Sequence, residues 1–225
     1  MMKRENILII GAGGIGGFLA DNLARALSFS GLGCERTIDD VCLTLMDGDL
    51  VEMRNLPHQR FGVNDVGKPK VVAMVDQLHA LGVTEERGVK LRPIAEDFSA
   101  DTDLSQYDLV VVAVDREEPR NLVHANAEHW LDLRARGDGF VMCSHEDGAE
   151  TLEGLPKLPA GQSTSCQLED AIERGNIQFG FALAASHGAQ WIVQWLRNSG
   201  LPQNRMYSIH MGDLPFPQAP EVDGE

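Results

Sequence analysis

A glycine-rich turn near the N-terminus has residue types and spacing that could bind a phosphate. Residues 11–16 read Gly-Ala-Gly-Gly-Ile-Gly and directly follow a short apolar run that ends at Ile10. In a G-x-G-x-x-G turn, the missing side chains let backbone amides approach a phosphate at the start of the next helix. The alternative is a strand-to-helix turn that binds nothing. We expect four glycines to bind a nucleotide, namely Gly11, Gly13, Gly14 and Gly16.

Polar residues after the second apolar run could bind the rest of a nucleotide. The carboxylates Asp47 and Asp49 follow the run 41–46, and both are candidates for nucleotide binding. Amide, guanidinium and ammonium groups beside a glycine turn supply donors and positive charge for a triphosphate. Asp47 alone could instead bind the ribose of a dinucleotide. The candidate donors come further along the chain: Asn55, Arg60 and Lys70.

Asp115 directly follows the fourth apolar run, 109–114, and is a candidate ligand for Mg²⁺. Proteins bind Mg²⁺ through one or two carboxylates together with substrate phosphates. Because ligands bind beyond the carboxyl ends of parallel strands, Gly13, Asp47 and Asp115 should surround one crevice. For each charged residue alone, a solvated loop charge or a helix cap is the alternative. Their order along the chain favours a shared site.

The elements that position these residues alternate through the first two thirds of the chain. Three segments have apolar residues at helical spacing: 16–27, 66–81 and 120–133. Alternating strands and helices predict an α/β fold, with a doubly wound, mostly parallel Rossmann-like sheet and helices on both faces. Five apolar runs are typical of buried strands: 6–10, 41–46, 89–94, 109–114 and 140–143.

The C-terminal third departs from this alternation. Residues from about 148 to 167 are rich in Gly, Pro, Ser and Thr, and we expect a crossover loop there. A helix is predicted at 176–197 and a strand at 206–211. We expect one domain over 1–213 and a flexible acidic tail over 214–225.

The composition disfavours several classes of function. The 225 residues include 19 Lys and Arg against 34 Asp and Glu, a net charge of −15, so we expect no binding to nucleic acid or to anionic membranes. The apolar runs are too short to span a membrane, and the N-terminus lacks the pattern of a signal peptide, which predicts a cytoplasmic protein. Four scattered cysteines without a C-x-x-C pair predict reduced thiols and no zinc.

Four ordered blocks of sequence resemble one enzyme family. They are GAGGIG at 11–16, DGDLVEMRNL at 47–56, VGKPK at 66–70 and VDREEPRN at 114–121. Over roughly residues 5–125 the chain resembles the ubiquitin-activating-enzyme-like adenylyltransferases, the superfamily that includes ThiF and MoeB. It lacks the paired C-x-x-C motifs of the biosynthetic members. Its C-terminal third is similar to that of short, divergent bacterial or plasmid-encoded members.

The resemblance implies an ATP-dependent adenylyltransferase that activates the C-terminal carboxylate of a small ubiquitin-like or sulfur-carrier protein. It also implies Mg²⁺ as a cofactor and a homodimer or a related heterodimer. By position, Asp47 would contact the ATP ribose and Asp115 would bind Mg²⁺, with Arg120 beside that site. Contacts to the phosphates are implied for Gly13, Gly14, Asn55 and Lys70.

One departure from the family pattern concerns an arginine that binds phosphate. The family's N-L-x-R-Q segment reads Asn-Leu-Pro-His-Gln at 55–59, so His58 stands at the expected arginine position. Arg60 and Arg54 are the candidates to replace it.

Cys166 is a candidate nucleophile at the end of the expected crossover loop. In thioester-forming relatives a cysteine in this loop accepts the adenylated carboxylate, so the resemblance implies a thioester on Cys166. A short helix beginning near Gln167 would lower the pKa of the thiol, whereas Glu169 and Asp170 would raise it. A packed structural cysteine is the alternative. The expected catalytic residues are Cys166, Arg60, Lys70 and Asp115.

Two other functions remain open at this point. An NAD(P)-dependent oxidoreductase is compatible with the glycine turn and Asp47, but it leaves residues 55–70 unexplained. A non-catalytic scaffold subunit, paired with an active partner, is compatible with His58 at the arginine position.

Overall fold

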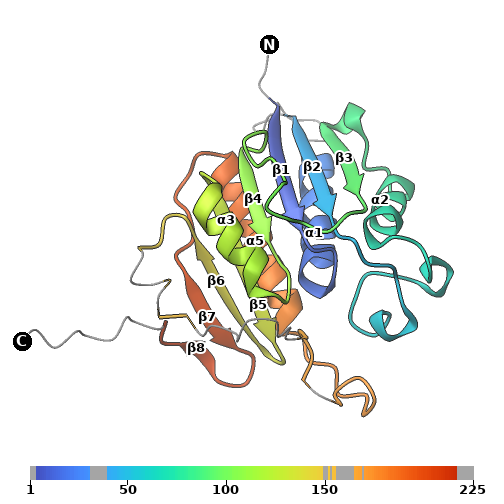
Figure 1. Ribbon diagram of the computed structural model, residues 1–225, viewed down its shortest axis with the longest axis vertical. Coiled ribbons are helices and arrows are strands. Elements are labelled where there is room, and N and C mark those ends of the chain that lie inside the picture. The colour runs from blue at the N-terminus through green and yellow to red at the C-terminus, as the bar shows by residue number, and fades with distance from the viewer. Residues whose placement is uncertain are drawn as a thin grey trace, which may run out of the picture.

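Eight strands form one sheet in the described part of the chain (Figure 1). The computed structural model describes residues 4–30, 40–148, 152, 154–155, 165–168 and 170–216. The strands are β1 (Glu5–Ile10), β2 (Val41–Met46), β3 (Val89–Ile94), β4 (Leu109–Val112), β5 (Trp130–Arg136), β6 (Gly139–Ser144), β7 (Arg205–Ser208) and β8 (Gly212–Leu214).

The order of the strands creates a crevice beside β1. From one edge to the other the order is β3-β2-β1-β4-β5-β6-β7-β8, so the chain first builds outward from β1 and then returns to β1's other side as β4. The five strands β3, β2, β1, β4 and β5 pair in parallel in that spatial order. The pairs β5–β6, β6–β7 and β7–β8 are antiparallel. The strand order reverses between β1 and β4. The connections that follow these two strands lead to opposite faces of the sheet and leave room for a ligand between them.

Helices cover both faces of the sheet, as the alternating pattern predicted (Figure 1). On one face, Leu19 and Phe181 share a core with Ile9 of β1. On the other face, Val123 packs in a second core with Ile10, because successive side chains of a strand point to opposite sides. The first face carries α1 (Gly14–Phe29), α2 (Lys70–Ala80) and α5 (Gly180–Leu196), and the second carries α3 (Glu117–Asn126). Three short 3₁₀ turns complete the elements: η1 (Met53–Asn55), η2 (Val63–Asp65) and η3 (Glu85–Arg87).

The helix predicted at 120–133 is wrong beyond Asn126. Helix α3 ends there, and the following residues form β5, which pairs with β4 through Val110 and Trp130. Apolar residues in so short a segment fit either a helix or a buried strand, so their spacing does not distinguish the two. Pairing with β4 on one side and β6 on the other decides for the strand, and buries Leu131 and Leu133 completely.

Other boundaries also differ from the predicted ones. Helix α2 begins only at Lys70, because Pro69 at the preceding position restricts the residue before it to extended backbone. The predicted acidic tail starts too early, since Leu214 still belongs to β8 and Phe216 packs against the second core. Residues 217–225, and most of the expected crossover loop, lie outside the described residues.

No helix among the described residues has the length and apolar character that crossing a membrane would require.

Candidate functional site

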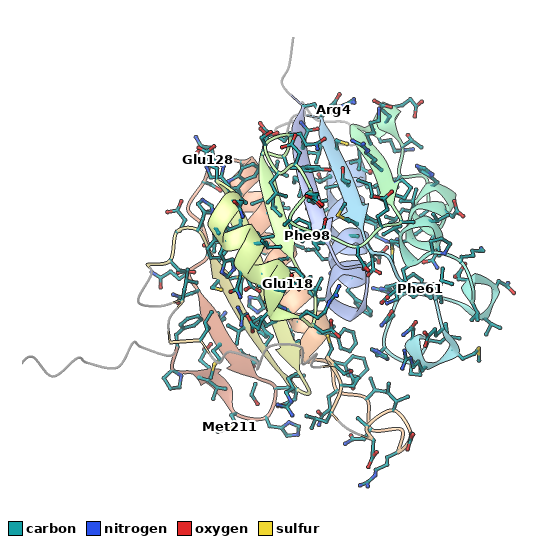
Figure 2. All side chains as sticks on the ribbon, in the orientation of Figure 1. Arg4, Phe61, Phe98, Glu118, Glu128 and Met211 are labelled. Atoms are coloured by element: carbon teal, nitrogen blue, oxygen red, sulfur yellow. The ribbon has the colours of Figure 1, made fainter. Side chains whose placement is uncertain are left out.

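A cleft of about 640 Å³ lies at the carboxyl ends of β1, β2 and β4. Its lining comes from the glycine turn after β1, the segment after β2 and the residues after β4. Phe98, labelled in Figure 2, is part of its lining on the side of α3. We call it the polar cleft. It brings together most of the residues singled out from the sequence: Gly11, Gly13, Gly14, Asp47, Asp49, Asn55, Lys70, Asp115 and Cys166.

The glycine turn presents backbone amides at the start of α1 to the polar cleft. Gly13 is the N-cap of α1, no side chain caps this helix, and its first turn contains no acidic residue. The first amides of a helix lack partners inside the helix and attract anions. Gly13 is also open, because a Cβ there would meet only the Gln59 amide nitrogen, at 3.7 Å. The turn therefore has the geometry of a phosphate site.

Gly14 lines the polar cleft beside Gly13, and the remaining two glycines of the motif serve close packing. Gly11 has φ +96°, and a Cβ there would lie 2.7 Å from the backbone oxygen of Ala113. A Cβ on Gly16 would overlap the Gly11 carbonyl, and Gly16 does not line the polar cleft. The sequence motif grouped four glycines as binding residues, whereas Gly16 acts by letting α1 approach the end of β1.

Asp47 fastens the glycine turn to the end of β2. Its Oδ2 accepts a hydrogen bond from the Ala12 amide at 2.7 Å, and its Oδ1 accepts one from the Asp49 amide at 2.8 Å. Burial raises the pKa of Asp47, while the charge of Lys70 and the two backbone donors act in the opposite direction. The carboxylate thus holds the turn in place and also lines the polar cleft.

Lys70 and Asn55 direct donors into the polar cleft. The Lys70 ammonium lies 2.6 Å from Asp49 Oδ2, and the lysine side chain is 8% exposed whereas that of Asp49 is 70% exposed. Asn55 is buried and uses its side-chain oxygen to accept the Glu52 amide at 2.8 Å. That bond leaves the Asn55 NH₂ group without a partner among the described residues. Both side chains can therefore donate to an anion.

The structure places Arg60 outside the polar cleft. Its guanidinium lies over the ring of Phe18, 4.1 Å from the centroid, and 3.3 Å from the Asp21 carboxylate. These contacts hold the side chain against α1, so Arg60 does not take the place of the expected arginine.

Two other arginines line the polar cleft. Arg54 does so while its Nε lies 2.5 Å from Glu52. Arg116, which the sequence reasoning missed, also does so and lies 3.7 Å from Asp97. Its position directly after Asp115 at the end of β4 was the available signal, because residues beyond a parallel strand line the ligand crevice.

His58, at the family's arginine position, adds no fixed positive charge. The side chain lines the polar cleft but only 8% of the residue is exposed. Burial and the charge of Lys70 both lower the pKa of His58. The ring is therefore neutral near pH 7 in the free protein.

Asp115 has the free carboxylate of the polar cleft. It forms no hydrogen bond or ion pair with the residues that the structure describes. By contrast, Asp47 binds two backbone amides and Asp49 binds Lys70. An unengaged carboxylate beside a phosphate site fits the donor set that Mg²⁺ takes from a protein.

Arg120 holds the backbone next to Asp115. It is buried, and its guanidinium bonds to the Val114 carbonyl and to Asp132, which has no exposed surface. Arg134 pairs with the same carboxylate at 2.8 Å. Arg120 therefore stands beside the expected Mg²⁺ ligand as a structural residue, because its donors are engaged by the protein.

A second, apolar cavity of about 360 Å³ adjoins the polar cleft. The two share Val114, Asp115 and Cys166 in their linings. We call it the apolar cavity. Half of its remaining lining comes from β6, β7 and β8: Gly139, Phe140, Val141, Met206, Tyr207 and Leu214. The other half lies on α1, α3 and β5 and includes four charged residues: Glu117, Arg120, Arg134 and Arg136.

Cys166 lies where the polar cleft and the apolar cavity meet. The pKa of this thiol is raised to about 11, chiefly by burial and also by Asp115, while Arg120 and a hydrogen bond from the Ile15 amide act in the opposite direction. The expected helix near Gln167 is absent from the described residues, where bends and turns occur instead. The helix terminus that reaches the sulfur is that of α1. The sequence left both a lowered and a raised pKa open, and burial decides for the raised one, so the thiol is protonated at neutral pH.

Comparison with known proteins identifies the family of this chain. The profile described as "ThiF family" matches residues 1–221. A curated relative, the ATP-dependent ubiquitin transferase-like protein Cap2 of Enterobacter hormaechei subsp. hoffmannii (strain UCI 50), is 29% identical over 111 residues. The matched part covers 49% of this chain but only 16% of Cap2.

Solved structures share the fold. A crystal structure of E. coli MccB with MccA-N7isoASN is 21% identical and superposes with a TM-score of 0.64, covering 96% of this chain and 66% of MccB. A crystal structure of E. coli MccB with ATP is 20% identical, with a TM-score of 0.58, covering 96% of this chain and 65% of MccB. This chain is thus about two thirds as long as the solved structures that it matches.

Proposed function

This chain belongs to the ThiF family, and from that premise we propose that it is an ATP-dependent adenylyltransferase acting on the C-terminal carboxylate of a small ubiquitin-like or sulfur-carrier protein. One observation carries the proposal. A glycine turn, Lys70 and the Asp115 carboxylate, which has no partner among the described residues, surround a single cleft that adjoins an apolar cavity. A triphosphate and an extended peptide end could then meet at Asp115.

The proposed reaction needs positioning and charge stabilisation rather than a protein base. A carboxylate oxygen of the partner attacks the α-phosphorus of ATP, the bond to the β-phosphate oxygen breaks, and the products are an acyl adenylate and pyrophosphate. The amides at the start of α1 and the Lys70 ammonium would stabilise the negative charge on the reacting phosphate. Asp47 would keep those amides in place through its bond to Ala12. Holding the carboxylate in line supplies the rest of the acceleration.

Asp115 is the residue that we propose to hold Mg²⁺. Its carboxylate has no other partner among the described residues and lines the polar cleft. When bound, Mg²⁺ would neutralise part of the charge on the phosphates. Arg120 would support this role indirectly, by fixing the Val114 carbonyl in the residue before Asp115.

The apolar cavity would accept the tail of the partner. Its lining is apolar on β6 to β8 and reaches Asp115, where the carboxylate must arrive. An extended tail cannot bury its own surface, so contacts with Met206 and Tyr207 would bury part of it and restrict its conformations. The partner class comes from the family resemblance, and the cavity supports the approach of a chain terminus.

A subsequent thioester on Cys166 is the finer part of the proposal. In this step the sulfur attacks the acyl carbon, the thiol loses its proton to solvent, and AMP leaves. Cys166 lies at the junction of the two cavities, next to the proposed site of the adenylate. With a pKa of about 11, only a small fraction is thiolate at neutral pH, so we expect this step to be slow unless the partner changes the surroundings.

Isotope exchange between pyrophosphate and ATP tests the proposed reaction. A candidate partner protein with a free C-terminus should support exchange, and the same protein with an amidated C-terminus should not. Exchange that persists with the amidated partner would contradict attack by the C-terminal carboxylate. Tight NAD binding without ATP binding would instead favour the dinucleotide oxidoreductase. ATP binding without exchange, with every candidate partner, would favour the scaffold subunit.

A further inference from the structure

His58 is a buried imidazole with an incomplete set of partners in the wall of the polar cleft. Its Nδ1 is buried and has no hydrogen-bond partner among the described residues. Its Nε2 lies 3.4 Å from the amide nitrogen of Gln59, whose own Oε1 is also unpaired. Buried polar atoms in native proteins are nearly always paired, so an unpaired ring nitrogen at a cleft calls for a ligand.

The fixed charges of the polar cleft do not favour a polyanion. Four acidic side chains and three cationic ones line it in the described part of the chain. Each cation already faces an acid: Lys70 faces Asp49, Arg54 faces Glu52 and Arg116 faces Asp97. A triphosphate adds several negative charges to this surplus. The side chains of the cleft therefore supply no surplus positive charge for the ligand that its glycine turn fits, and Mg²⁺ at Asp115 would offset only part of the ligand's charge. The lining acids are Asp47, Asp49, Asp97 and Asp115.

The surroundings of His58 explain why it is neutral without a ligand and what would change that. Phe181 of α5 contacts the ring edge to face, with 6.3 Å between centroids, and carries no charge. Gly14 of α1 packs against the His58 backbone. Lys70 of α2 is the charged neighbour that lowers the pKa of His58, together with burial. A polyanion beside Lys70 would offset this repulsion, and imidazole is the side chain that can gain charge near neutral pH.

We propose that His58 takes up a proton when a polyphosphate binds in the polar cleft and donates a hydrogen bond from Nδ1 to it. This inference rests on the proposed ATP site and adds to it a proton-linked affinity. The orphaned Nδ1 gains its acceptor, and the protonated Nε2 gains one when the Gln59 amide rotates to present its unpaired Oε1. The cleft gains a positive charge in the same event. A protonated ligand-bound state and a neutral free state give tighter binding at lower pH, by at most about tenfold per pH unit for one proton.

Calorimetry with MgATP tests the proposal. Titrations at one pH in two buffers of different ionisation enthalpy give the number of protons taken up on binding. Wild type should take up more protons than His58→Gln and His58→Asn, by a difference approaching one, and this subtraction removes the protons that ATP itself exchanges. His58→Arg should bind with an affinity that changes little between pH 6 and 8. His79→Gln changes an exposed histidine at the end of α2 and should match wild type.

The outcomes separate this inference from the proposed function. Equal proton uptake by wild type and both neutral variants, with equal affinity, would overturn the role of His58 and leave the ATP site standing. Failure of wild type to bind MgATP would overturn both. Two neutral variants are included because Gln and Asn fill the buried ring site differently, and thermal melting identifies a variant that is unfolded.

Discussion

The polar cleft and the apolar cavity meet at Asp115 and Cys166, but their walls are built differently. The polar cleft uses backbone amides and charged side chains from connections after parallel strands. The apolar cavity uses side chains that stand on the antiparallel strands themselves, such as Phe140 and Met206. The first wall can stabilise charge, and the second can bury an uncharged chain. The difference suits a reaction between a polyphosphate and the end of a peptide.

The largest expected effect comes from removing the carboxylate at the junction. Asp115→Ala should reduce pyrophosphate exchange by roughly 1,000-fold, because Asp115 is the proposed ligand of Mg²⁺. Its side chain bonds to none of the described residues, so the free energy of unfolding should change by less than about 0.5 kcal/mol. Exchange assays and thermal melting measure the two quantities. Asp101→Ala, on an exposed loop, is the control, and retained exchange in Asp115→Ala would exclude the assignment.

A second change alters the polar cleft only. Lys70→Met should reduce exchange about 100-fold, since it removes a cation from the phosphates while keeping the buried stem. The fold should tolerate it, because the acid left behind, Asp49, is largely exposed to water. Lys68→Met is the matched control, as Lys68 is half exposed and pairs with Asp65. Equal losses in the two variants would mean that Lys70 acts through general electrostatics rather than through contact.

The pH dependence of adduct formation on Cys166 tests whether this thiol is the nucleophile at the junction of the two cavities. Because the pKa is about 11, the thiolate fraction rises about tenfold per pH unit below that value. Formation of a reductant-sensitive adduct from preformed adenylate should rise by the same factor between about pH 7 and 9. Single-turnover gels measure this rate. Cys166→Ser should give at most an adduct that resists reductant, and an unchanged adduct in that variant would assign the chemistry to another residue.

The smallest expected effect concerns the apolar cavity alone. Met206→Ala should raise KM for the partner about fivefold by removing apolar contact with its tail, and should leave KM for ATP unchanged. Steady-state exchange with each substrate varied in turn measures both constants. Met211→Ala is the control, because Met211 is 76% exposed at the tip of the β7–β8 hairpin (Figure 2). A rise in KM for ATP instead would show that the two cavities do not act separately.

Much of the fold was predictable from the sequence for a local reason. The glycine turn, the buried strands β1, β2 and β4 and helices α1 and α5 follow from patterns that repeat within a few residues. The run 89–94 also forms a strand, but β3 lies at the edge of the sheet and only Val89 is buried, so the expected burial was wrong there. The positions of Asp47 and Asp115 at strand ends were enough to predict that they lie near Gly13, because parallel strands end at the same edge. Strand β5 was missed, since its identity depends on pairing with β4, which is distant in sequence.

The environment of each side chain required the tertiary structure. Arg60 was the predicted catalytic residue and Arg54 the other candidate for the missing arginine, yet Phe18 and Asp21 of α1 hold Arg60 outside the polar cleft. The pKa of Cys166 depends on burial and on Arg120, which no local pattern indicates.

The sequence by itself determined that this chain has a glycine turn, acids at strand ends and a basic residue to serve a phosphate, because these features depend on residue type and local spacing. Only the tertiary structure decided which charges remain available. Packing among the described residues pairs Arg54, Lys70 and Arg116 with acids, gives the Asp115 carboxylate no partner there and buries His58 without a full set of partners. Pairing and burial are set by contacts between residues far apart in the chain, and they govern the charge that a ligand meets.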